Sequence, residues 1–176
     1  MAITISGSGI TSANIADGTI VNADINSSAA IDGSKLTGAG KVLQVVNATY
    51  STQLTTTPTS FTNTGLSAAI TPSATSSKIL ILITNSFYAT TSNYIFSAIK
   101  RSISGGADTF LGNADDGLAV ILDNQGDGTS PATLNYLDSP STTSATTYYN
   151  QYKCSHSARA QMSGSMASII LMEIAG

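Results

Sequence analysis

One aliphatic residue recurs at nearly fixed intervals through the first part of the chain. The spacing is five residues, with a single step of six, over Ile10, Ile15, Ile20, Ile25, Ile31 and Leu36. Five residues is not a helical period, and residues five apart point to opposite faces of a strand. A short extended piece followed by a bend, repeated along the chain, fits this spacing, because the intervening residues are mostly turn formers.

A single copy of this segment, with about one large apolar residue in five, cannot bury enough surface to offset the entropy of ordering its backbone. A beginning rich in Ser, Ala, Gly and Asp is also typical of a flexible leader. The regular spacing favours instead a stalk of several chains, in which rings of aliphatic side chains fill the centre, or an attachment segment held by another protein. We therefore expect residues 1–40 to be a stalk or anchor and residues 41–176 to be a separate domain.

The rest of the sequence has the composition of an all-β domain. Ser and Thr make up more than a quarter of the chain, charged residues make up 10%, and Glu173 is the only glutamate. Helix formers are therefore too scarce for a long amphipathic helix. Turn residues bound candidate strands at 41–46, 66–70, 78–84, 87–90, 93–103, 109–111, 118–122, 132–137, 146–155 and 166–174, with an edge strand or loop at 52–64.

These short strands predict an antiparallel β-sandwich of jelly-roll type, because no helix is available to cover a parallel sheet. The most hydrophobic stretch, 78–84, is short and lies between turn residues. Such a run is typical of a central strand that is buried on both faces. The strand at 166–174 is expected to tie the end of the chain into a sheet.

Charge and hydropathy limit the partners of the domain. The first 34 residues hold three aspartates and no Lys or Arg, so the remaining seven acidic residues balance the seven basic ones. Nucleic-acid binding is not expected, because Lys100 and Arg101 form the only adjacent basic pair. Membrane insertion and secretion are not expected either, because long apolar runs and a signal-peptide pattern are absent. The single cysteine, Cys154, fits a reducing cytoplasm and is expected to be a small buried apolar residue.

Several motifs spread over nearly the whole chain are shared with a known class of proteins. They are Ile-x-x-x-x-Ile-Ala-Asp-Gly-Thr-Ile-x-Asn-Ala-Asp-Ile at 10–25, Gly-Lys-Val-Leu-Gln-Val-Val at 40–46, Thr-Gly-Leu-Ser-Ala-x-Ile-Thr-Pro-Ser-x-Thr-Ser-Ser-Lys-Ile-Leu at 64–80, Thr-Leu-Asn-Tyr-Leu-Asp-Ser-Pro at 133–140 and Leu-Met-Glu-Ile-Ala at 171–175. In these motifs the chain resembles virion proteins of tailed bacteriophages, especially phages of cyanobacteria and marine bacteria. The resemblance implies a homotrimeric appendage with a β-sandwich tip, assembled into virions in the cytoplasm of the bacterial host.

The resemblance and the stalk together predict a non-enzymatic structural protein without a cofactor. It is expected to be a short trimeric tail fibre or receptor-binding tip that attaches the phage to its host. The alternative is a capsid decoration or head-fibre protein that stabilises the phage head, and a carbohydrate-binding module of the host is a third reading. The expected partners are two further copies, the virion proteins that hold the N-terminal segment, and a host surface glycan.

Catalysis is not predicted from the acidic residues or from the one histidine. The aspartates are nearly all in loop-like settings next to Gly, where Asp most often forms turns, and His156 is expected to lie on the surface or in a hydrogen-bonded strand. Asp123 and Asp127 form a weak candidate for a calcium loop. Gln125 replaces the usual Asp or Asn there, and no acidic residue closes the loop, so an exposed turn is the favoured reading.

The tyrosines of the strand at 146–155 are the candidate receptor contacts. Tyr148 and Tyr152 share a face with Cys154 and are expected to pack in the core. Tyr149 and Lys153 lie on the other face, where an exposed ring and an ammonium group are suited to stacking on a sugar and hydrogen bonding to it. We therefore expect any receptor contact of this strand to involve Tyr149 and Lys153.

Overall fold

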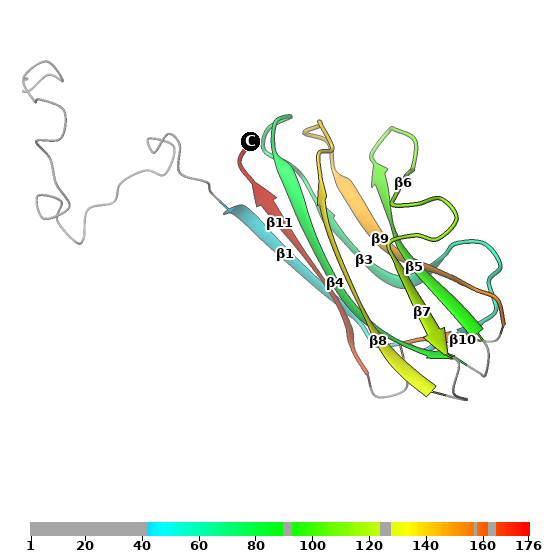
Figure 1. The fold of residues 1–176 in the computed structure, drawn as a ribbon. Coiled ribbons are helices and arrows are strands. Elements are labelled where there is room, and N and C mark those ends of the chain that lie inside the picture. The colour runs from blue at the N-terminus through cyan, green and yellow to red at the C-terminus, as the bar shows by residue number, and fades with distance from the viewer. Residues whose placement is uncertain (1–41, 90–92, 124–127, 157, 162–164) are drawn as a thin grey trace, which may run out of the picture. The chain divides into compact units, whose positions relative to one another are not determined.

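The computed structural model describes residues 42–89, 93–123, 128–156, 158–161 and 165–176 (Figure 1). The aliphatic residues of the predicted stalk, from Ile10 to Leu36, lie outside these ranges, and their role in a trimeric core stays a prediction. Every secondary-structure element in these ranges is a β-strand. The described residues contain no helix that is long and apolar enough to cross a membrane.

Two antiparallel sheets make up the described part of the chain. The strands are β1 (Val42–Tyr50), β2 (Leu54–Thr56), β3 (Thr62–Ile70), β4 (Lys78–Ala89), β5 (Asn93–Ile103), β6 (Thr109–Leu111), β7 (Ala119–Asp123), β8 (Gly128–Asp138), β9 (Thr146–Cys154), β10 (Ala158–Ala160) and β11 (Ala167–Ile174). Every strand pairing is antiparallel, as the sequence predicts.

The first sheet is organised around β4, its longest strand. One edge of β4 pairs with β11 over its first half and with β10 over its second half, and the other edge pairs with β8. β1 pairs with β11 and β2 pairs with β10. β10 and β11 are therefore two halves of one row, and β8, which contains Pro131, lies at an edge where a missing amide donor costs nothing.

The second sheet has the order β3, β9, β5, with β6 and β7 both paired along the free edge of β5. Its strands alternate between side chains that point into the core and side chains that point outward. The inner faces of the two sheets share a core, which is consistent with a β-sandwich (Figure 1).

A polar layer divides this core into two apolar clusters. One cluster contains Ile83, Ile99 and Tyr148, and the other contains Phe87, Ile95 and Tyr152. Between them on the same three strands lie Asn85, Ser97 and Asn150, all buried. Asn85 Nδ2 donates to Asn150 Oδ1 at 2.8 Å, and Asn150 Nδ2 donates to Ser97 Oγ at 3.0 Å. The buried amides thus satisfy one another.

The structure changes several strand predictions. β4 continues through the two strands predicted at 78–84 and 87–90, and β8 begins inside the predicted turn before residue 132. The strand at 78–84 is not buried on both faces, because Leu80 and Leu82 point away from the core and are only half-buried in the single chain. β10 was not predicted, because its three residues are too few to show a periodic pattern.

Candidate functional site

The strand β9 sends its tyrosines to two different faces. Tyr148, Tyr152 and Cys154 point into the core and are buried, which confirms the packing role expected for them. Tyr149 and Lys153 point outward, and each is half-buried. The alternation of strand side chains therefore places the two predicted receptor-contact residues on the same outer surface.

The neighbouring strand β5 adds further rings and charges to this surface. Register places Phe96 beside Lys153 and Lys100 beside Tyr149. The ammonium of Lys153 lies 4.9 Å from the centroid of the Phe96 ring, and that of Lys100 lies 4.8 Å from the centroid of Tyr149. Each outward-facing lysine thus lies over an aromatic ring, an arrangement that favours a cation electrostatically.

Residues from outside β5 and β9 complete the cluster. Phe61, which immediately precedes β3, places its ring 5.1 Å from the ammonium of Lys153 and 4.7 Å from the ring centroid of Phe110 in β6. Tyr94 stacks on Phe96 with 6.4 Å between centroids and is 47% exposed. We call this set the aromatic face: it consists of Phe61, Tyr94, Phe96, Phe110 and Tyr149, with Lys100 and Lys153.

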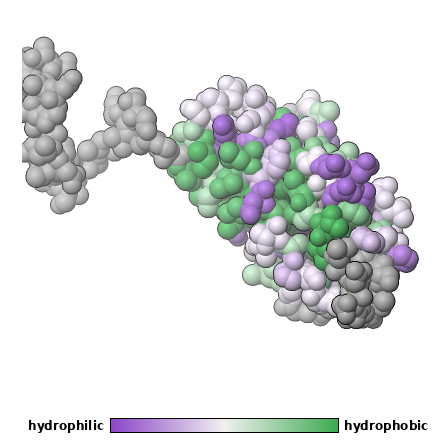
Figure 2. Space-filling view, in the orientation of Figure 1, coloured by the Kyte–Doolittle hydropathy of each residue, from purple (hydrophilic) through white to green (hydrophobic). Residues whose placement is uncertain are grey.

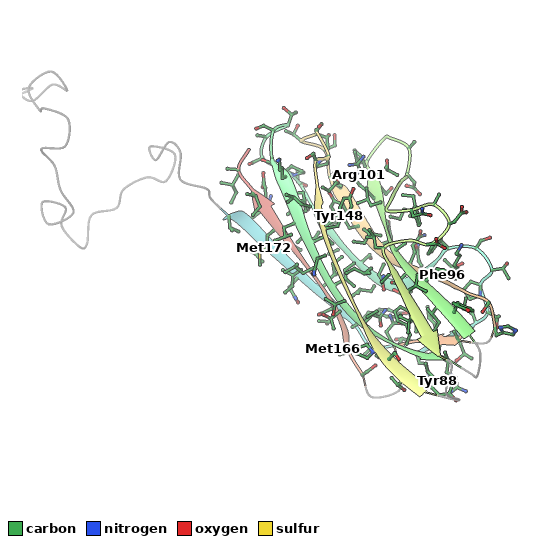
Figure 3. The ribbon with its side chains drawn as sticks, viewed as in Figure 1. Tyr88, Phe96, Arg101, Tyr148, Met166 and Met172 are labelled. Atoms are coloured by element: carbon green, nitrogen blue, oxygen red, sulfur yellow. The ribbon has the colours of Figure 1, made fainter. Side chains whose placement is uncertain are left out.

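An open pocket of about 270 Å³ lies at one end of the aromatic face, with Phe96 labelled in Figure 3. Its lining residues are Thr59, Phe96, Lys153, Cys154 and Ser155. The pocket thus combines an aromatic ring with an ammonium group and hydroxyl groups. Burial raises the pKa of the Cys154 thiol to about 11, so the thiol stays protonated at neutral pH and is a poor nucleophile.

The two lysines of the aromatic face differ in their partners. Lys100 donates to Asp108 Oδ2 at 2.8 Å, and hydrogen bonds from Lys100 and Ser102 lower the pKa of Asp108. Lys153 forms no ion pair with any carboxylate in the described ranges. Its ammonium, lying between the rings of Phe61 and Phe96, is therefore the cation best placed to donate to an added ligand.

A buried acidic group lies away from this face. Asp138, which the sequence placed in a loop-like setting, is instead the last residue of β8 and is buried. Arg101 Nη1 donates to the Asp138 carboxylate at 2.8 Å, and Tyr148 Oη donates to it at 2.7 Å (Figure 3). The pKa of Tyr148 is raised, mainly by burial and also by its hydrogen bond to Asp138. These contacts join the two sheets. Shielded from solvent, the carboxylate is suited to holding the fold rather than to acting on a substrate.

The remaining predicted site residues are placed only in part. Asp123 ends β7, and Asp127 lies outside the described residues, so the calcium loop stays untested. In the described ranges, no group of three or more His, Cys, Asp or Glu side chains could hold a metal. His156 is exposed in the turn after β9, with Nδ1 3.2 Å from Ser155 Oγ.

Sequence reasoning did not find the phenylalanines of the aromatic face. The alternation of residues 93–103, with Ile95 and Ile99 in the core, is a signal that could have placed Phe96 outward. Phe61 and Phe110 carry no such signal, because their approach to Lys153 and to each other depends on which strands pair.

Comparison with known proteins adds no relative to this description. No protein-family model matches the chain, and a search of curated proteins finds no similar sequence.

Proposed function

We propose that the protein is a non-enzymatic appendage of a tailed-phage virion, a short trimeric tail fibre or tip that binds a glycan on the host surface. The observation that carries this proposal is the aromatic face, with the ammonium of Lys153 between two rings beside an open pocket and without a carboxylate partner among the described residues. The motifs shared with virion proteins of tailed phages support the setting.

A neutral sugar is the ligand that best fits the chemistry of this face. Aromatic rings stack on the apolar C–H faces of sugars, and Lys153 and the pocket hydroxyls can hydrogen-bond to sugar oxygens. The domain at 41–176 has seven acidic and six basic residues, so it offers no net positive charge to a polyanion. A mixture of rings with few charges therefore favours a glycan over a nucleic acid.

The strand order supports a jelly-roll topology for the tip. Leaving aside the three-residue strands, the first sheet contains β1, β11, β4 and β8, and the second sheet contains β3, β9, β5 and β7. Successive strands of the chain largely alternate between the sheets, as in double Greek-key sandwiches. In this arrangement the aromatic face belongs to the sheet that contains β9.

The trimer and its attachment come from residues 1–40 in this proposal. The aliphatic residues at near-fixed spacing, Ile10 to Leu36, form rings at the axis, and other virion proteins hold the segment. The protein is therefore part of the virion after assembly in the bacterial cytoplasm.

Cell binding by the full-length chain tests the glycan proposal. Phe96→Ala removes the ring that contacts both Lys153 and Tyr94, and we expect binding of labelled protein to host cells to fall at least about tenfold. Met166→Ala is the matched control, because Met166 is the most exposed large apolar side chain in the described ranges, at 67%, and lies off the aromatic face (Figure 3). Equal binding by both variants, or binding that survives periodate oxidation of the cell-surface sugars, would contradict glycan recognition by this face.

Location on the virion separates the fibre from the decoration protein. Immunogold label on the tail end of intact particles agrees with a host-attachment fibre. Label spread over the head would overturn the fibre proposal and support the capsid decoration function instead.

A further inference from the structure

The outer face of the first sheet carries apolar residues in cross-strand register. Val45 in β1 lies opposite Met172 in β11, Met172 lies opposite Leu80 in β4, and Leu80 lies opposite Leu137 in β8. We call these four residues the apolar row. Val45 is 56% exposed and Leu137 is 52% exposed, so both ends of the row are open to solvent in the single chain.

Further apolar side chains extend this row toward both of its sides. Ile170 and Leu82 lie opposite each other, two residues from Met172 on β11 and from Leu80 on β4. Val42 and Leu43 are exposed at the start of β1. Figure 2 shows hydrophobic residues gathered over the start of β1, and Figure 3 shows where Met172 lies on this sheet. Contiguous exposed apolar groups of this kind mark interaction surfaces in soluble proteins.

The sequence of β4 points to a covered surface. Residues 79–83 are all aliphatic, a pattern typical of a strand buried on both faces. In the single chain only Ile79, Ile81 and Ile83 reach the core, while Leu80 and Leu82 stay half-buried on the outer face. A second layer over this face would complete the burial that the sequence indicates.

The charge of the face suits a copy of the same chain. The apolar row and its flanking partners Ile170 and Leu82 are uncharged, and Lys78 is the charged residue at the adjoining end of β4. In a three-fold assembly this surface of each copy can face the common axis, and the three copies meet there without like-charge repulsion because the centre of the surface carries no charge.

The strand β1, which holds one end of the apolar row, directly follows the segment that is proposed to join the copies. Residue 42 is where the chain enters the sheet, and the residues before it carry the repeated aliphatics. If three copies associate through that segment, as the proposed function requires, the starts of their β1 strands are held close together. Tethering then raises the effective concentration of one apolar row near another.

We infer that the apolar row is a contact surface between copies of this chain, and that a neighbouring copy covers Leu80 and Met172. This inference rests on the proposed trimeric assembly. It assigns the first sheet to assembly and leaves the second sheet, with its aromatic face, free for a ligand.

Site-specific cross-linking of the full-length chain tests the inference. Val45→Cys, treated with a short bis-maleimide, is expected to give linked chains at a yield at least about tenfold above that of Val120→Cys. Val120 is the matched control, because it is an exposed valine, at 48%, on the outer face of the other sheet. The unsubstituted chain, whose Cys154 is buried, supplies the background.

A second pair of variants tests the contact by measuring self-association without a cross-linking reagent. Val45→Asp places an unpaired charge in the row, and we expect self-association in sedimentation equilibrium to weaken at least about tenfold, while Val120→Asp leaves it unchanged. Equal cross-linking and equal association for the two positions in an oligomeric protein would overturn the inference and leave the proposed assembly standing. A monomeric unsubstituted chain would overturn both the inference and the proposed trimer, but not glycan binding by the aromatic face.

Discussion

Glu173 should make the stability of the domain depend on pH in the acidic range. Its side chain is fully buried near the start of β1, where Ser73 donates to Oε1 from both its amide and its hydroxyl at 2.7 Å, and Gln44 Nε2 donates to Oε2 at 2.6 Å. Burial alone would raise the pKa, but the nearby Ser77 hydroxyl and the hydrogen bonds from Ser73 and Gln44 lower it from an ordinary value of 4.5 to about 2.

The size and sign of the effect follow from this shift. A difference of roughly 2.5 pKa units corresponds to on the order of 3 kcal/mol of folding free energy. Because the folded-state pKa is below the unfolded one, this stability is fully present above about pH 4.5 and is lost as the pH falls toward 2. At pH 7 the charged carboxylate therefore favours the folded state.

Urea unfolding of wild type and Glu173→Gln, followed by circular dichroism from pH 7 to pH 2.5, measures the effect. We expect the variant to be less stable by about 3 kcal/mol at pH 7, because its amide keeps one oxygen and its NH₂ would face either the donors of Ser73 or that of Gln44. We also expect the difference in stability to shrink as wild type is protonated. Asp108→Asn is the control, because the Asp108 carboxylate is exposed beside Lys100 and should hardly change the midpoint. A gap that stays constant over this pH range would refute the assignment of the stability to the Glu173 charge.

Two further substitutions test the packing. Gly65 has φ +91°, and a Cβ there would overlap the Tyr50 ring, so Gly65→Ala should lower the free energy of unfolding by more than about 1 kcal/mol. Gly105→Ala is the control and should cost less, because Gly105 has φ +78° but open space around it; equal losses in thermal unfolding would exclude the clash. Asp138→Asn breaks a buried pair with Arg101 and should cost about 3 kcal/mol in urea unfolding, and a loss typical of surface pairs, under about 1 kcal/mol, would contradict the role of this pair in joining the sheets.

The sequence predicted those features that depend on one strand at a time. Alternation along residues 146–155 placed Tyr148 and Tyr152 in the core and Tyr149 outside, because side chains of a strand alternate whatever the strand pairs with. Composition also predicted the absence of long helices. The position of Asp138 was missed, because its burial depends on Arg101 of a strand far away in the sequence.

Features that arise from pairing between strands could not be predicted in this way. The aromatic face joins Phe61, Phe96 and Phe110 from three separate segments, and no local pattern says that these segments meet. The aliphatic run of β4 predicted burial on both faces, and the single chain supplies a cover for only one. The pattern of apolar residues indicates which faces of a strand are buried, but not whether the same chain or another molecule buries them.

The buried amides between the two apolar clusters also fix the alignment of the strands. Asn150 of β9 accepts a hydrogen bond from Asn85 of the facing sheet. Sliding β9 by two residues would put the ring of Tyr148 or Tyr152 in the place of Asn150 and leave the buried amide of Asn85 without this partner, so the native alignment is strongly selected. Phe96 and Gln151 are the direct neighbours of Ser97 and Asn150 on their strands, so the same constraint sets the spacing of groups on the outer surface. Outward-facing residues can then be exchanged without moving the backbone. Under the proposed function, a phage that meets a new host could change what this domain recognises while its framework stays the same.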